Sequence, residues 1–127
     1  MIKLKTDERQ RILTVEVEGM ISEADIDTAI DALQAAYPAI GVHVRGEERT
    51  FRMVVDWEKL EGWEKGAKTA GTLTTKLIGN AASKIAVIAD AKWADEEARL
   101  ADLAKKAEIR FFPPQKRAEA LVWLGAS

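Results

Sequence analysis

The chain is predicted to fold as an α/β domain with a five-stranded, mostly parallel sheet, one antiparallel edge strand and four helices. Two alternating apolar segments near the N-terminus are separated by a short polar turn, which is typical of a hairpin. Each later strand candidate is followed by a helical segment, an order that favours parallel strands joined by crossovers. The 127 residues suffice for one hydrophobic core and no linker divides them, so residues 1–127 are expected to form a single domain.

The hairpin is expected from residues 1–5 and 11–19, where apolar and polar residues alternate. Ser22 then begins a helix as its N-cap, with Asp25 three residues later in a variant of the capping box. The apolar residues that follow have helical spacing. Pro38 marks the end of this helix, because the residue before a proline disfavours helical geometry.

Strands and helices alternate over the rest of the chain. A polar connection comes first, and the later elements are a strand at 50–57, a helix at 63–77, a strand at 84–90, a helix at 92–106, a strand at 107–112 and a helix at 113–124. The strand at 84–90 is a continuous apolar run, as expected for a strand covered on both faces. Two prolines open the last helix, where a missing N–H matters least.

Composition argues against several classes of function. The chain has no cysteine, which excludes disulfides, thiolate catalysis and zinc sites built on sulfur. Its net charge is −2, so no strong field favours nucleic acid. No apolar run reaches the roughly 18 residues of a membrane-spanning helix, and the charged N-terminus lacks the apolar region of a signal peptide. We therefore expect a cytoplasmic protein with no nucleic-acid partner.

Catalytic and metal-binding signatures are also missing. The single histidine, His43, falls in a polar connection. A solvated loop residue is the favoured interpretation, and metal binding or acid–base chemistry is the alternative. Ser22 is explained as a helix cap and Ser83 as a turn residue before a strand, so no nucleophile–base pair is evident. No HExxH, GxSxG or P-loop motif occurs. We expect no enzymatic activity, no cofactor and no metal.

The segment MVVDWEKLEGWEKGA, residues 53–67, is expected to leave a buried strand and enter a helix. Asp56 would end its strand and Asp90 would end the next one. The favoured interpretation is that both carboxylates cap their loops by accepting hydrogen bonds from nearby N–H groups. The alternative is a ligand site, because open α/β sheets bind ligands at the carboxyl ends of their strands.

Two glycines in the same segment also have two interpretations. Gly62 would supply a turn and Gly66 would allow close packing of the helix on the sheet. Alternatively, free N–H groups at the helix start would attract an anion, helped by Lys65 and Lys68. Lysines outnumber acids across this part of the chain; the lysines are Lys59, Lys65, Lys68, Lys76 and Lys84. This excess of positive charge is typical either of a solvated helix face or of a helix that lies on an anionic membrane surface.

Three of the four tryptophans, Trp57, Trp63 and Trp93, fall at strand-to-helix connections on one edge of the predicted sheet. Trp123 lies in the last helix. Tryptophan buries a large area and is usually found in cores or interfaces. Ordinary packing of helix N-termini is the favoured interpretation, and an apolar pocket or a patch facing a partner is the alternative.

Four segments carry a family resemblance: VEGMISEADID, VVDWEKLEGWEKGA, KIAVIADAKW and AEIRFFPPQKRAEALVWL. Together they resemble the bacterial SpoIIAA-like family of the STAS superfamily, which is also compared with CRAL-TRIO lipid-transfer domains. They span about Leu13 to Leu124. The resemblance implies a β-α superhelix with a parallel sheet and one antiparallel edge strand. Anti-sigma-factor antagonists of this fold carry a phosphorylatable serine after the third strand. The corresponding stretch here, Glu64 to Ala67, has no hydroxyl, which argues against a phosphorylation switch.

Without a phosphorylation switch, the resemblance implies a non-enzymatic binding module for a small apolar or lipid-like ligand. A homodimer and a peripheral membrane contact are further expectations. The ligand is expected beneath the helices at 63–77 and 92–106, in contact with Asp56, Trp57, Trp63, Leu73, Leu77 and Trp93. The alternative is a protein–protein interaction or regulatory module that docks through Gly62, Lys65, Gly66 and Lys68.

Overall fold

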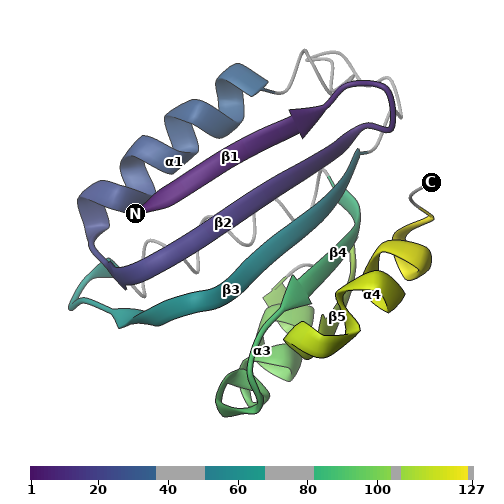
Figure 1. Cartoon of the computed structure of the whole chain (residues 1–127). Coiled ribbons are helices and arrows are strands. Elements are labelled where there is room, and N and C mark those ends of the chain that lie inside the picture. Colours follow the sequence, from purple (N-terminus) through teal and green to yellow (C-terminus); the bar gives the residue numbers. More distant parts are fainter. Residues whose placement is uncertain (37–50, 68–81, 104–106, 126–127) are drawn as a thin grey trace.

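The computed structural model describes residues 1–36, 51–67, 82–103 and 107–125 (Figure 1). Within these ranges five strands form one sheet in the order β1-β2-β3-β4-β5. The strands are β1 Ile2–Asp7, β2 Ile12–Ile21, β3 Phe51–Trp63, β4 Ala82–Ile88 and β5 Glu108–Phe112. The α-helices in the described ranges are α1 Glu23–Ala36, α3 Glu96–Leu103 and α4 Arg117–Leu124, three rather than the expected four. The helix expected at 63–77 lies mostly outside the described residues.

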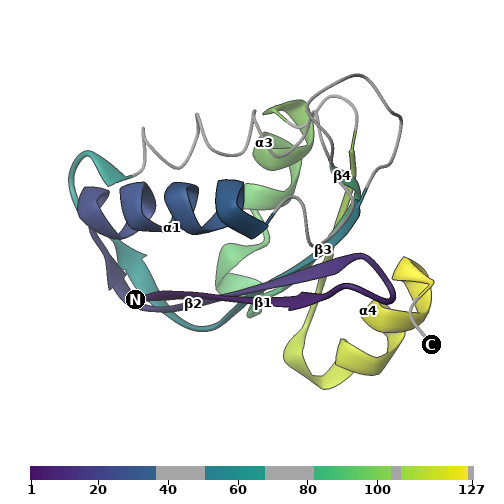
Figure 2. The same cartoon turned by 90° about the horizontal axis from the view of Figure 1, so that it is seen from above.

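The sheet confirms the predicted topology. β1 pairs with β2 in antiparallel fashion, and β2, β3, β4 and β5 pair successively in parallel. The helices α1 and α3 lie over one face of the sheet and α4 lies over the other (Figure 2). A sheet between two helical layers buries both of its faces where the helices cover it.

Two clusters of buried side chains correspond to these two faces. The larger cluster packs α1 and α3 against the sheet and includes Leu13, Ile26, Leu33, Met53, Trp57 and Leu100. The smaller cluster lies beneath α4 and includes Ile12, Val54, Ile88, Phe112, Ala120 and Leu124. Neighbouring residues of one strand, such as Ile12 and Leu13, belong to opposite clusters because successive strand side chains point to opposite faces.

The capping box at the start of α1 is confirmed. The Asp25 carboxylate accepts hydrogen bonds from the Ser22 backbone N–H and hydroxyl, both at 2.9 Å. In return, the Ser22 hydroxyl accepts a hydrogen bond from the Asp25 N–H at 3.1 Å. The bond from the Ser22 N–H is the main reason that the pKa of Asp25 lies below its ordinary value of 3.8. Two N–H groups that would otherwise lack partners are satisfied in this way.

This capping box predicts a pH-dependent difference between the wild type and Asp25→Ala. Because the folded-state pKa is lowered, the carboxylate stabilises the folded state above pH 3.8 and loses this effect as the pH falls through the lower folded-state value. The variant is therefore expected to be less stable than the wild type near neutral pH and to approach it in acid. Urea unfolding across this range measures the difference. Asp27→Ala, at an exposed position of the same helix, is the matched control.

β3 is longer than expected and contains two irregularities. It runs to Trp63, whereas the sequence predicted an end near Asp56. Glu16 and Glu18 of β2 are separated by one residue, whereas their partners Asp56 and Lys59 in β3 are separated by two. A further residue of β3, between Leu60 and Gly62, has no counterpart in β2. Such bulges interrupt the alternation by which strands are recognised in a sequence. The prediction of a loop after Asp56 and of a turn at Gly62 is therefore wrong.

The helix predicted at 92–106 is also revised. Ala91–Trp93 form a short 3-10 helix, and the α-helix α3 begins only at Glu96. Asp90 precedes the 3-10 helix without a side-chain capping hydrogen bond, so the predicted capping role of Asp90 is wrong. Ser83 lies inside β4 rather than in a turn, and its hydroxyl donates a hydrogen bond to the Phe51 carbonyl at 3.3 Å.

The C-terminus of α4 is held by two cations from the sheet. Arg52 donates to the Leu124 carbonyl at 2.7 Å, and the Lys84 ammonium donates to the Trp123 carbonyl at 3.1 Å. Both positive charges face the negative end of the helix dipole. Gly125 follows in the left-handed conformation, with φ at 79°, which closes the helix. Lys84 therefore anchors α4.

Candidate functional site

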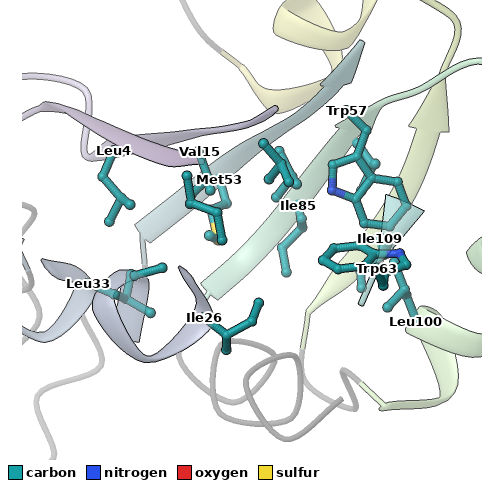
Figure 3. Close-up of a pocket in the computed structure, with 15 residues that line it drawn as sticks. Leu4, Val15, Ile26, Leu33, Met53, Trp57, Trp63, Ile85, Leu100 and Ile109 are labelled. Carbon is teal, nitrogen blue, oxygen red and sulfur yellow. The ribbon is translucent and has the colours of Figure 1, made fainter. Parts of the chain in front are cut away.

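The larger core contains an apolar cavity of about 130 Å³. All five strands contribute to its described wall, together with α1 and α3. The described lining residues are Ile2, Leu4, Val15, Val17, Ile26, Ala29, Leu33, Met53, Val55, Trp57, Trp63, Ile85, Val87, Leu100 and Ile109. Figure 3 shows Ile26 and Leu33 of α1 across the cavity from Val15, Met53 and Ile85 of the sheet.

The described wall is aliphatic apart from two indole rings. None of its side chains carries a charge, a hydroxyl or a carboxamide. An apolar cavity of this kind does not hold ordered water well, because water there finds few hydrogen-bonding partners. The described wall therefore favours apolar occupants by their hydrophobic contact area.

The tryptophans predicted to lie near one another do so, with Trp57 at the centre. The ring of Trp57 makes edge-to-face contacts with Trp63, Trp93 and Phe111, at centroid distances of 5.7, 5.9 and 5.7 Å. Trp57 and Trp63 line the cavity, and Trp93 supports Trp57 from outside the described wall. Trp123 lies apart, in the cluster beneath α4, where it contacts Phe112 at 5.8 Å.

The irregularities of β3 place these side chains on one face. Trp57, Leu60 and Trp63 are three residues apart, yet Trp57 and Leu60 belong to the larger cluster and Trp63 packs against it. In a regular strand, residues separated by three positions point to opposite faces. The extra residues after Asp56 and after Leu60 restore the inward direction each time. The bulges are thus the local structure that brings Trp63 to the cavity.

Asp56 does not contribute to this cavity. It neighbours Trp57 in β3 and lies on the opposite face, where its carboxylate pairs with the Arg117 guanidinium of α4. The Glu58 N–H donates to the other Asp56 oxygen at 2.9 Å, so the predicted local hydrogen bond exists, although within a strand. Arg117 also approaches Glu58 at 3.4 Å, and the hydrogen bond to Asp56 raises the pKa of Arg117. These contacts give Asp56 a structural role in fastening α4 to the sheet.

The Asp56–Arg117 pair should be measurable by a double-mutant cycle of Asp56→Asn and Arg117→Met. Because Arg117 is partly exposed, the expected coupling in the free energy of unfolding is about 0.5 to 1 kcal/mol. Urea unfolding of the single and double variants gives this value. The same cycle on Lys5 and Glu16, an ion pair with a more exposed cation, is expected to give a smaller coupling free energy. A coupling near zero at Asp56 would contradict the anchoring role.

The predicted interaction residues lie at the end of β3. Gly62 is within the strand, and a side chain there would crowd the Met20 sulfur, 3.2 Å from the ideal Cβ position. Gly66 has φ at 90°, and a Glu23 carboxylate oxygen lies 3.0 Å from its ideal Cβ position. That carboxylate opposes an anion at this turn. Lys65 is exposed. Lys68, Leu73, Leu77 and His43 lie outside the described residues.

The sequence interpretation missed the contribution of α1 and β1 to the cavity. Ile26, Ala29 and Leu33 line it from α1, and Ile2 and Leu4 line it from β1. Helical spacing marked the inward face of α1, and alternation marked that of β1. Periodicity identifies a buried face, but a filled core and a cavity wall have the same pattern.

A second cavity, of about 120 Å³, lies on the other face and is lined by Glu16, Val17, Glu18, Asp56, Glu58 and Lys59. Its acids already have cations beside them: Lys5 lies 3.0 Å from Glu16, Lys59 lies 3.9 Å from Glu18, and Arg117 pairs with the remaining two. Across the described ranges, no group of three or more histidines and acids is arranged to hold a metal ion. None of the helices in these ranges combines the length and apolar character that a membrane-spanning segment needs.

Comparison with known proteins identifies a common fold. A family model described as SpoIIAA-like matches residues 12–125. The chain is similar to an uncharacterised protein of the DUF3478 family with a SpoIIAA-like fold from Shewanella loihica PV-4, with a TM-score of 0.72 and 18% identity over 98% of this chain and 92% of that chain. No match was found among curated proteins.

Two structures of SpoIIAA itself are also similar. The anti-sigma factor antagonist SpoIIAA in its unphosphorylated form has a TM-score of 0.60 and 6% identity over 96% of this chain and 98% of that chain. The Bacillus cell fate determinant SpoIIAA in its phosphorylated form has a TM-score of 0.60 and 7% identity over 95% of this chain and 99% of that chain. At these identities the likeness concerns the fold.

Proposed function

Because the chain belongs to the SpoIIAA-like family of the STAS superfamily, we propose that it is a non-enzymatic binding module whose ligand is a small apolar molecule or the apolar end of a lipid. The observation that carries the proposal is the cavity of about 130 Å³ between the sheet and helices α1 and α3. The family supplies the fold, and the cavity supplies the site.

The size of the cavity limits what it can hold. In another protein, an engineered apolar cavity of roughly 150 Å³ stays dry and binds benzene. A cavity of about 130 Å³ therefore suits a six-membered ring or a short branched hydrocarbon. A longer lipid would place only its apolar end inside. Ligand contacts would come chiefly from Met53, Trp57 and Trp63 of β3 and from Ile26 and Leu33 of α1.

Benzene binding followed by methyl NMR tests the proposal. The methyl groups of Ile26, Leu33 and Ile85, which line the cavity, are expected to shift and saturate with benzene. The methyl groups of Ile88 and Leu124 belong to the cluster beneath α4 and are expected not to shift, so they serve as an internal control. Equal small shifts in both sets, or none up to the solubility limit of benzene, would refute the proposed function.

The membrane contact, the homodimer and the protein-interaction alternative stay predictions. Exposed large apolar side chains in the described ranges include Met20 at the end of β2 and Leu121 and Val122 on α4. Sedimentation with vesicles of anionic and neutral lipids tests the membrane contact, and light scattering tests the dimer. The interaction alternative predicts that Lys65→Glu, at an exposed position, removes a partner protein from a pull-down.

A further inference from the structure

The described cavity wall offers hydrogen-bond donors without offering charge. Of the described side chains that line it, only those of Trp57 and Trp63 contain nitrogen or oxygen. An indole has one N–H donor and no acceptor. The described wall therefore presents two donors, no acceptor side chain and no ion.

Trp57 is the better placed of the two donors. Trp57 is only 5% exposed, so most of its indole ring is shielded from bulk water. Figure 3 shows Nε1 of Trp57 on the edge of the ring that faces Met53 and Ile85, across the cavity. Among the described residues, the buried side-chain donor without a partner is Nε1 of Trp93, and Trp93 does not line the cavity.

The described wall is a poor environment for a charged ligand. A carboxylate or ammonium group loses its hydration on entering an apolar cavity, and the described wall has no ion to replace that hydration. A neutral carbonyl or ether oxygen loses less hydration free energy than a charged group does. The Trp57 N–H can replace part of the hydrogen bonding that this oxygen makes to water. The charge of a ligand is therefore expected to have the larger effect on its affinity for the described wall. The position of its hydrogen-bond acceptor is expected to have the smaller effect.

We propose that the described wall of the cavity selects neutral molecules that have an apolar body about the size of a six-membered ring and one hydrogen-bond acceptor directed at Nε1 of Trp57, and that this wall disfavours charged molecules of the same size. This inference rests on the proposed function, because it specifies the ligand class of the same site. It assigns to Trp57 a ligand-binding role beyond packing.

Three compounds with the same number of non-hydrogen atoms test the charge rule: cyclohexanone, methylcyclohexane and cyclohexylammonium. The two neutral compounds are expected to shift the cavity methyl resonances, and the cation is expected to bind at least about a hundredfold more weakly than methylcyclohexane. Binding of the cation within about tenfold of the hydrocarbon would overturn the charge rule. If neither neutral compound binds, the proposed function itself fails, which is a different result.

The role of Trp57 is tested in the wild type through its indole N–H resonance, assigned by its loss in Trp57→Phe. Cyclohexanone is expected to shift this proton downfield as the hydrogen bond forms, and methylcyclohexane is expected not to do so. The Trp123 resonance, from the opposite face, is the internal control. A Trp57 proton that responds equally to both compounds would overturn the assignment.

Affinities in Trp57→Phe provide an independent measure. The two neutral compounds differ in hydration, so the informative quantity is the change in each affinity between the wild type and the variant. Cyclohexanone is expected to lose about three- to tenfold more affinity than methylcyclohexane, since only the ketone uses the N–H. Retained binding of methylcyclohexane shows that the variant is folded. Trp123→Phe is the matched control, and it is expected to leave both affinities unchanged.

Discussion

Replacement of Trp57 by alanine is expected to lower the free energy of unfolding by about 3 to 5 kcal/mol. The Trp57 side chain is 5% exposed and is the shared partner of three edge-to-face contacts, with Trp63, Trp93 and Phe111. The substitution removes the buried area, leaves a larger hole beside the cavity and ends all three contacts. Since a domain of this size is stable by about 5 to 15 kcal/mol, the loss is a large fraction of the total.

Urea unfolding followed by circular dichroism measures this effect. Trp123→Ala is the matched control, because Trp123 is only partly buried and has one aromatic partner, Phe112. It is expected to lose clearly less stability than Trp57→Ala. Trp57→Phe, which keeps one ring, is expected to fall between the wild type and the alanine variant. A loss below about 1 kcal/mol for Trp57→Ala would contradict a central role of Trp57 in the core.

Filling the cavity from α1 with Ala29→Leu is expected to lower benzene affinity at least about tenfold without destabilising the fold. Ala29 lines the cavity from within α1, and leucine is nearly as good a helix former as alanine. The added carbon atoms would occupy the space that benzene needs. They would also bury apolar area in the absence of ligand, so the melting temperature is expected to stay level or rise.

Ala32→Leu is the matched control for this experiment. It makes the same change on the same helix, at an exposed position three residues later. It is expected to leave benzene affinity unchanged. Unaltered binding in Ala29→Leu, together with wild-type stability, would place the bound benzene somewhere other than this cavity. A large loss of stability in Ala29→Leu would show that the site is already well packed.

Local chemistry predicted several elements well. The Ser22–Asp25 capping box specified the start of α1, because a serine hydroxyl and a carboxylate three residues apart satisfy N–H groups without tertiary help. The hairpin of β1 and β2 followed from alternation around a polar turn. The apolar run of β4 indicated a strand covered on both faces, and helices lie on both faces of the sheet.

The end of β3 could not be predicted in the same way. After Asp56 the inward residues Trp57, Leu60 and Trp63 are spaced by three, which resembles neither a regular strand nor a clear helix. The two bulges that produce this spacing exist only because β2 provides the partner against which β3 is paired. The role of Asp56 depends similarly on Arg117, which is distant in sequence and is brought to it by α4.

By itself the sequence determined the fold class, the order of the strands and the faces that are buried in the described elements, since periodicity, capping and turn chemistry act between near neighbours. It also indicated that Trp57, Trp63 and Trp93 would lie near one another. Only the tertiary structure decided that Asp56 faces away from them, that α1 supplies part of the cavity wall and that a cavity of about 130 Å³ lies within the larger core. The physical reason is that a cavity depends on how well distant side chains fill the space between layers, and apolar spacing is the same whether or not that space is filled.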